Sequence, residues 1–246
     1  MTTPASPSSC PAVNHSPVSP ISDLRLVLLG RKGVGKSMAG NTILGAGFEF
    51  GKPTEECIKR RADVNGIKVT VVDTPGWEWY YPLNSTPNWV KRETLRSITL
   101  CPPGPHAILL VVRSLLPVFL TCTEAYRKAI EYNVNLVASD IWEHAMVLFT
   151  WGETLGVNIE QHIQRNGEHR KLIEKCKGRY HVLTSKKNNS SIAKLFEKMN
   201  EAINKRDDLV VTELGLWRCK PSDSEEICQR KQVFQSHKNN QKTCFG

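Results

Sequence analysis

The stretch VLLGRKGVGKSMAGNTILG, residues 27–45, decides the fold. It passes from an apolar, strand-like run through a glycine-rich turn into a segment with the apolar spacing of a helix. The turn matches the phosphate-binding pattern G-x-x-x-x-G-K-[ST], with Gly30, Gly35, Lys36 and Ser37 at its fixed positions. Because glycines let several backbone N–H groups converge on an anion at the start of a helix, we predict a phosphate site here.

Two side chains of this loop have predicted roles of their own. Lys36 is expected to face the outer phosphates of a bound nucleotide, and the hydroxyl of Ser37 is placed to bind Mg²⁺. The alternative is a glycine-rich turn with an incidental lysine, but it does not account for the strand and helix on either side. The predicted phosphate-binding residues of the loop are Gly30, Arg31, Lys32, Gly33, Val34, Gly35, Lys36, Ser37 and Met38.

A second motif, VTVVDTPG at residues 69–76, supports the same interpretation. Asp73 ends an apolar run, where a carboxylate can hold Mg²⁺ through water, and the N–H of Gly76 can reach a terminal phosphate. The contact from Gly76 N–H to the terminal phosphate forms only when the bound nucleotide is a triphosphate. An ordinary turn after a strand would also fit DTPG, but not at this distance after a phosphate loop, so the two motifs together indicate a nucleoside-triphosphate switch.

Short apolar runs alternate with longer amphipathic segments through the middle of the chain. Strands are predicted at 24–29, 67–72, 107–112, 145–150 and 180–183, and a further hairpin strand within 57–66 is predicted to turn at Asn65-Gly66. Helices are predicted at 36–44, 88–100, 123–138, 158–176 and 190–204, with Asn166-Gly167 as a potential break in the fourth. Continuous apolar runs are typical of strands buried on both faces, so we predict an α/β, three-layer P-loop fold: a mostly parallel sheet of about six strands with helices on both faces.

The 246 residues suffice for one sizeable domain with tails. Residues 1–22 contain five prolines and six serines and no charged side chain, which predicts a disordered tail. The domain is expected to occupy 23–205, and 206–246 to form a polar, basic tail with room for one short helix.

A net charge of +9 and a pI near 9.2 suit an anionic partner. Lysine and arginine are scattered and lack an aromatic platform beside them, so we expect phosphate ligands and no nucleic acid.

The longest apolar segment, from Ala107, is interrupted by Arg113 and Pro117, which argues against a transmembrane segment. The start lacks a signal-peptide pattern, and eight cysteines show neither Cys-x-x-Cys pairs nor zinc spacing, so we expect a cytoplasmic protein with reduced thiols. Weak docking of the basic tail on a membrane stays open.

The segments GRKGVGKSMAGNTILG, PTEEC, DTPG and CPPGPHAILLVV, with GRYHVL near residue 178, resemble the immunity-associated nucleotide-binding proteins, the GIMAP or AIG-type GTPases. The resemblance covers about residues 23–205. It implies a guanine-nucleotide-binding domain that uses GTP or GDP with Mg²⁺, and it implies that Thr54 is the switch threonine that joins Ser37 on the metal. It also implies GTP-dependent pairing with the same or related domains across the nucleotide face, with weak or absent hydrolysis.

Two residues near the family's CPPGPHAILLVV segment have alternative interpretations. His106 and Arg92 could contact a partner subunit. A buried histidine at a strand start and a solvated arginine are the simpler interpretation, and we prefer it.

The base-reading segment departs from the family pattern, which approximates Thr-Arg-Lys-Asp. This chain has Thr150, Trp151, Gly152 and Glu153. Glu153 can supply the carboxylate and Trp151 can stack on the base, but Gly152 cannot replace a lysine stem, so base selectivity is an open question. The predicted guanine-binding residues are Thr150, Trp151, Glu153, Thr184 and Ser185, the last two standing where the family usually has an asparagine pair.

Catalysis is also affected, because Trp77 follows DTPG where Ras-like enzymes place a water-orienting glutamine. At most a slow GTPase is expected, and no catalytic residue is assigned. The aromatic segment WEWYY, with Trp77, Trp79, Tyr80 and Tyr81, predicts either a partly packed loop or a partner-contact surface. A nucleotide-independent interaction module with a degenerate domain is the main alternative function, and an ATPase with altered base choice is a third.

Overall fold

The computed structural model describes residues 21–45, 53–78, 86–114, 123–138, 140–152, 158–183 and 189–207. Both predicted tails fall almost entirely outside these ranges. So do Trp79, Tyr80 and Tyr81, together with the predicted base-contacting residues Glu153, Thr184 and Ser185.

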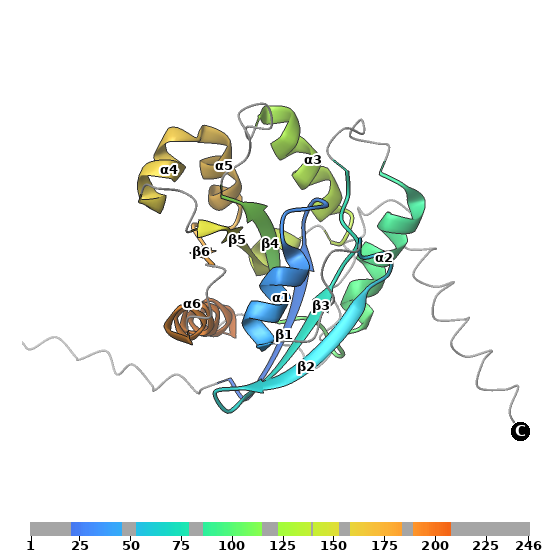
Figure 1. Ribbon diagram of the computed structural model, residues 1–246, viewed down its shortest axis with the longest axis vertical. Coiled ribbons are helices and arrows are strands. Elements are labelled where there is room, and N and C mark those ends of the chain that lie inside the picture. The colour runs from blue at the N-terminus through green and yellow to red at the C-terminus, as the bar shows by residue number, and fades with distance from the viewer. Residues whose placement is uncertain are drawn as a thin grey trace, which may run out of the picture.

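The described strands form one six-stranded sheet in the order β2-β3-β1-β4-β5-β6 (Figure 1). Antiparallel pairing is confined to β2 with β3, and the other four pairings are parallel. The strands are β1 Asp23–Leu29, β2 Ile58–Val64, β3 Ile67–Asp73, β4 Ala107–Arg113, β5 Ala145–Thr150 and β6 Tyr180–Val182. The predicted fold class and strand positions are confirmed.

The β2–β3 hairpin turns where the sequence predicts it. Asn65 and Gly66 have φ angles of 54° and 80°, the left-handed backbone that an Asn-Gly hairpin turn requires. The side chain of Asp63 accepts a hydrogen bond from Gly66 N at 3.0 Å and fixes the turn. The register pairs Val64 with Ile67 and Ile58 with Asp73, so β2 begins beside the predicted metal site.

The helices agree with the predicted segments to within a few residues at each end. They are α1 Lys36–Leu44, α2 Asn88–Thr99, α3 Glu124–Asn135, α4 Ile159–Arg165, α5 Gly167–Lys175 and α6 Asn189–Asp207, with a short 3-10 turn η2 at Ile141–His144. The break between α4 and α5 falls at Asn166, whose side chain caps α5 by accepting hydrogen bonds from the backbone N–H groups of Glu168 and His169.

Two hydrophobic clusters, one on each face of the sheet, hold the layers together. Side chains of α1 and α6 pack on one face around Leu26, Leu28 and Leu109. Side chains of α3 and α5 pack on the other around Val27, Leu110 and other strand residues, together with η2. Neighbouring strand residues point alternately into the two clusters, which explains the continuous apolar runs in the sequence. The carboxyl ends of β1, β3, β4 and β5 therefore meet at one edge, where the phosphate loop lies.

Candidate functional site: a phosphate loop with a metal-binding edge

The phosphate loop joins β1 to α1 with little space around its backbone. A Cβ at Gly30 would lie 2.6 Å from Val111 O, so a larger residue would collide with the backbone of β4. Gly35 has a φ angle of 89° and precedes the first residue of α1, with Ala39 N donating to Gly35 O at 2.8 Å. The strand, loop and helix required by the motif are all present.

Lys36 lies within the loop with its side chain largely buried. Its Nζ donates to Arg31 O at 3.2 Å, and 7% of the residue is exposed. Burial lowers the pKa of Lys36 to about 8, against the opposing effect of the Asp73 carboxylate. A phosphate bound in the loop would favour the charged ammonium, because it would add an opposite charge at this desolvated position.

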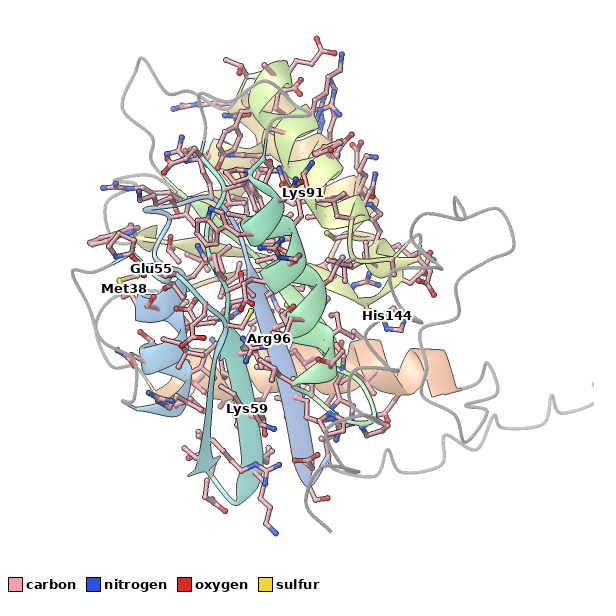
Figure 2. The ribbon with its side chains drawn as sticks, turned by 90° about the vertical axis from the view of Figure 1, so that its right-hand side faces the viewer. Met38, Glu55, Lys59, Lys91, Arg96 and His144 are labelled. Atoms are coloured by element: carbon pink, nitrogen blue, oxygen red, sulfur yellow. The ribbon has the colours of Figure 1, made fainter. Side chains whose placement is uncertain are left out.

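The three residues predicted to bind metal come together at one carboxylate oxygen. Ser37 Oγ donates to Asp73 Oδ2 at 2.6 Å, and Thr54 Oγ1 donates to the same oxygen at 3.1 Å. The two hydroxyl oxygens are 3.5 Å apart. Met38 and Glu55, the chain neighbours of the two hydroxyl residues, are labelled on the left-hand side of Figure 2. The sequence brings Thr54 here from a separate segment, as the family resemblance implies.

This cluster fits a magnesium ion. Its donors are two hydroxyls and a carboxylate, the hard oxygen ligands that Mg²⁺ prefers. Asp73 is 1% exposed, and its second oxygen, Oδ1, is buried without a hydrogen-bond partner among the described residues. A buried carboxylate oxygen without a partner is costly, so a cation or its water shell at this position would stabilise the site.

The DTPG segment packs directly on the phosphate loop. A Cβ at Gly76 would lie 2.4 Å from Lys32 N, so no larger residue fits there without displacing backbone. Trp77 O accepts a hydrogen bond from Lys32 N at 2.8 Å, and Thr74 Oγ1 donates to Leu28 O at 2.7 Å. The predicted position of Gly76, beside the loop that would hold the phosphates, is consistent with this packing.

Trp77 itself belongs to the core. It is 1% exposed and packs with Val27 and Val72 in the cluster that also holds side chains of α3 and α5. For Trp77, the structure therefore supports the packed-loop interpretation over the partner-contact surface. The other three aromatic residues of WEWYY lie outside the described ranges. An indole buried in this way presents no acceptor to a water molecule at the phosphates.

At the base end of the site, Thr150 supports the phosphate loop. Its Oγ1 donates to Val34 O at 2.7 Å and lies 3.4 Å from Val112 O, and the residue is fully buried. The hydroxyl is thus engaged with the loop backbone, and a direct contact of Thr150 with a base stays a prediction.

Trp151 has an unusual backbone angle, and Gly152 has little space for a side chain. Trp151 has a φ angle of 61°, which side-chain-bearing residues rarely adopt, and Arg113 Cζ lies 5.1 Å from the centre of its ring. A Cβ at Gly152 would lie 2.3 Å from Val182 Cγ1, so a lysine stem has no room unless Val182 moves. Sequence analysis missed the role of Arg113, because an arginine at the end of an apolar strand gives no signal of the ring it will face.

Glu93 is a second residue that sequence analysis missed. Its carboxylate accepts a hydrogen bond from Cys57 N at 2.6 Å, and its backbone O lies 3.0 Å from Cys57 Sγ. Arg96, labelled on α2 in Figure 2, pairs with Glu93 at 2.9 Å. Burial raises the pKa of the Cys57 thiol, and the nearby Glu93 charge raises it further. The hydrogen bonds between Cys57 and Glu93 also attach the segment after Thr54 to α2.

His106 and Arg92 lie away from the phosphate loop. His106 precedes β4 at the opposite edge of the sheet, where its Nδ1 accepts from Arg25 N at 3.0 Å and its backbone N donates to Arg25 O at 2.8 Å. Arg92 is exposed on α2. The exposed position of Arg92 agrees with a solvated arginine, whereas His106 stands at the strand start as expected but is only partly buried.

The strand order, the phosphate-loop motif after β1 and the DTPG segment after β3 define a P-loop domain of the G-domain fold. The AIG1 family model matches residues 24–239, and the chain belongs to that family. The matched region extends past Asp207, the last residue that the structure describes.

Relatives of known name agree with this assignment. Immune-associated nucleotide-binding protein 13 of Arabidopsis thaliana is 31% identical over 189 residues, which cover 73% of this chain and 53% of that protein. GTPase IMAP family member 8 of Rattus norvegicus is 33% identical over 159 residues, covering 62% of this chain and 22% of that protein. The chain thus spans about half the length of the first relative and less of the second.

Solved structures show the same fold at low identity. Toc33 from Arabidopsis thaliana in complex with GDP and Mg²⁺ has a TM-score of 0.59 and 13% identity, covering 76% of this chain and 86% of that one. Era in complex with MgGDPNP and a fragment of 16S ribosomal RNA has a TM-score of 0.51 and 13% identity, and the match covers 74% of this chain and 57% of the Era chain. Within the described residues, no helix is long and apolar enough to cross a membrane.

Proposed function

We propose that this chain is a Mg²⁺-dependent guanine-nucleotide switch that pairs with another G domain in the GTP state and hydrolyses GTP slowly at best. The observation that carries the proposal is the shared contact of Ser37 and Thr54 with Asp73 Oδ2. It unites the phosphate loop, the switch threonine and DTPG in one cluster, as a triphosphate-sensing site requires. The named relatives and the Toc33 complexes with GDP or GMPPNP and Mg²⁺ support it.

In this function Lys36 and the loop N–H groups bind the phosphates, and Gly76 N–H binds the terminal phosphate. Ser37 and Thr54 would hold Mg²⁺ directly and Asp73 through water, and the ion supplies positive charge that stabilises the bound phosphates. Thr150 fixes the loop through Val34 O. Trp151, Glu153, Thr184 and Ser185 are proposed to form the base site, with Thr150 beneath it.

The decisive experiment is equilibrium binding of fluorescent GTP with Mg²⁺, competed in parallel by GTP, GDP, ATP and XTP. Selective displacement by GTP and GDP is expected. Lys36→Ala should abolish binding, because no other buried ammonium lies in the described part of the loop. Lys171→Ala, a change in an exposed lysine on α5, serves as the control. Unchanged affinity in Lys36→Ala would contradict the site assignment.

A second candidate function is an interaction module whose assembly does not depend on nucleotide. The observation in its favour is that Gly152 packs closely on the side chain of Val182, so a lysine at this position would require Val182 to move. Light scattering with GTP, with GDP and without nucleotide separates the two functions. Association that is equal in all three conditions supports the module, and association with GTP alone supports the switch.

A further inference from the structure

The side chain of Lys32 lies in the phosphate loop but on its exposed side. Its Nζ donates to Glu78 Oε1 at 2.9 Å, with side-chain exposures of 50% for the lysine and 21% for the glutamate. Glu78 stands two residues after Gly76, so this ion pair connects the phosphate loop to the segment that follows DTPG. An exposed ion pair contributes little to the stability of the fold. The Lys32–Glu78 pair is therefore of interest for its place between the phosphate loop and the segment after DTPG.

The backbone of Lys32 is in close contact with Gly76. A Cβ on Gly76 would approach Lys32 N to 2.4 Å and Lys32 Cα to 2.6 Å. Lys32 N also donates to Trp77 O at 2.8 Å, and Arg31 forms an isolated parallel bridge with Trp77. Any group that accepts a hydrogen bond from Gly76 N–H therefore lies within reach of the flexible four-carbon stem of Lys32.

We infer that Lys32 is a triphosphate-specificity residue whose ammonium exchanges Glu78 for the terminal phosphate of a bound nucleotide. The inference rests on the proposed function, because it needs a nucleotide in the phosphate loop with its terminal phosphate on Gly76. A terminal phosphate carries more negative charge than a carboxylate and presents three acceptor oxygens, so it competes for the ammonium. A diphosphate ends before Gly76 and leaves the Lys32–Glu78 pair intact.

The exchange predicts opposite effects for the two members of the pair. Lys32→Gln should lower the ratio of GMPPNP affinity to GDP affinity by about 5- to 20-fold, because a charge-assisted hydrogen bond is lost and solvent screens part of its strength. Glu78→Gln should raise the same ratio by about 2- to 5-fold, because the phosphate no longer competes with a carboxylate. Both side chains are partly exposed, so both variants should fold normally.

The structure offers a matched control in Lys171. Its Nζ pairs with Glu168 Oε1 at 2.7 Å, with side-chain exposures of 51% and 17%, close to those of the Lys32–Glu78 pair. Both residues of this pair lie within α5, and Glu168 also pairs with Arg127 on α3. Lys171→Gln removes the same charge from the protein and should leave the affinity ratio within twofold of the wild type.

The experiment is equilibrium binding of GMPPNP and GDP with Mg²⁺ to the full chain and to its variants, at low and high salt. In a Lys32→Gln background, Glu78→Gln should have no further effect on the ratio. A ratio unchanged by Lys32→Gln, or a Glu78→Gln effect that persists without Lys32, would overturn the inference while the proposed function stands. Failure of the wild type to bind either nucleotide would overturn the proposed function, and the inference with it.

Discussion

Thr150 shows how one hydroxyl connects a strand end to the phosphate loop. It is fully buried at the end of β5, and its Oγ1 donates to Val34 O in the middle of the loop. The loop has few side chains that could hold its backbone in place, because three of its first six residues are glycine. The contact from β5 therefore helps to set the loop conformation before any phosphate binds.

Thr150→Val tests this role, since valine keeps the shape and removes the donor. We expect the free energy of unfolding to fall by about 1–3 kcal/mol, because a buried carbonyl loses its partner. Nucleotide affinity should fall with it. Urea unfolding and fluorescent-nucleotide titration measure the two effects, and Thr150→Ser, which keeps the hydroxyl, should lie close to the wild type. A valine variant as stable as the wild type would show that the contact contributes little.

Among the structural elements, α5 and β6 carry buried histidines that make stability depend on pH. His169 on α5 is 2% exposed, packs edge-on against Phe149 and lies 3.2 Å from His162 Nε2. Burial, with a smaller contribution from His162, lowers the pKa of His169 to about 4. Burial also lowers the pKa of His181 on β6 to about 4. Both therefore stay neutral in the folded protein at pH values where the unfolded chain binds protons.

The sign of the effect follows from proton linkage. Because the unfolded state binds more protons between pH 6.5 and 4, the free energy of unfolding should fall as the pH falls through this window. Between pH 7.5 and 5 each histidine should account for about 2 kcal/mol. Urea unfolding of His169→Gln should show a shallower pH dependence by about that amount, and His144→Gln, on η2, is the control. An unchanged pH dependence would mean that His169 protonates without cost.

The elements were largely predictable from the sequence, because each has a local signal. The Asn65-Gly66 turn and the α4–α5 break at Asn166 follow from residue types whose backbone or capping preferences are strong. The contact between Ser37 and Asp73 follows from two motifs at the ends of adjacent parallel strands. Thr54 depended on the family resemblance, because a threonine after a proline has no distinctive signal.

The remaining parts of the site depend on tertiary contacts that no local pattern encodes. Glu93 on α2 accepts a hydrogen bond from Cys57 N, 36 residues away in the chain. Arg113 on β4 lies over the ring of Trp151, 38 residues away. The sequence does not distinguish a packed position from a surface position for Trp77, because its neighbours in WEWYY are also aromatic. Packing against Val27 and Val72 decides that it is buried.

At the scale of the whole molecule, the sheet brings the groups proposed to bind phosphate to one edge, and few described groups there are suited to activate water. The groups proposed to bind the terminal phosphate, Lys32, Lys36 and Gly76 N–H, are all hydrogen-bond donors. Asp73 is engaged by two hydroxyls, and the Trp77 indole is buried. Under the proposed function, we therefore expect the described part of one chain to stabilise phosphate charge better than it orients an attacking water.

In the proposed function, a second G domain supplies the groups that one chain lacks. We expect GTP hydrolysis per molecule to be slow at low protein concentration and to rise as the concentration approaches the dissociation constant of the GTP-bound pair. Phosphate release measured over a range of protein concentrations tests this, with light scattering on the same samples. Asp73→Asn, which weakens the metal site, should abolish the rise. A rate per molecule that is independent of concentration, while GTP-dependent association is observed, would place all of the catalytic groups within one chain.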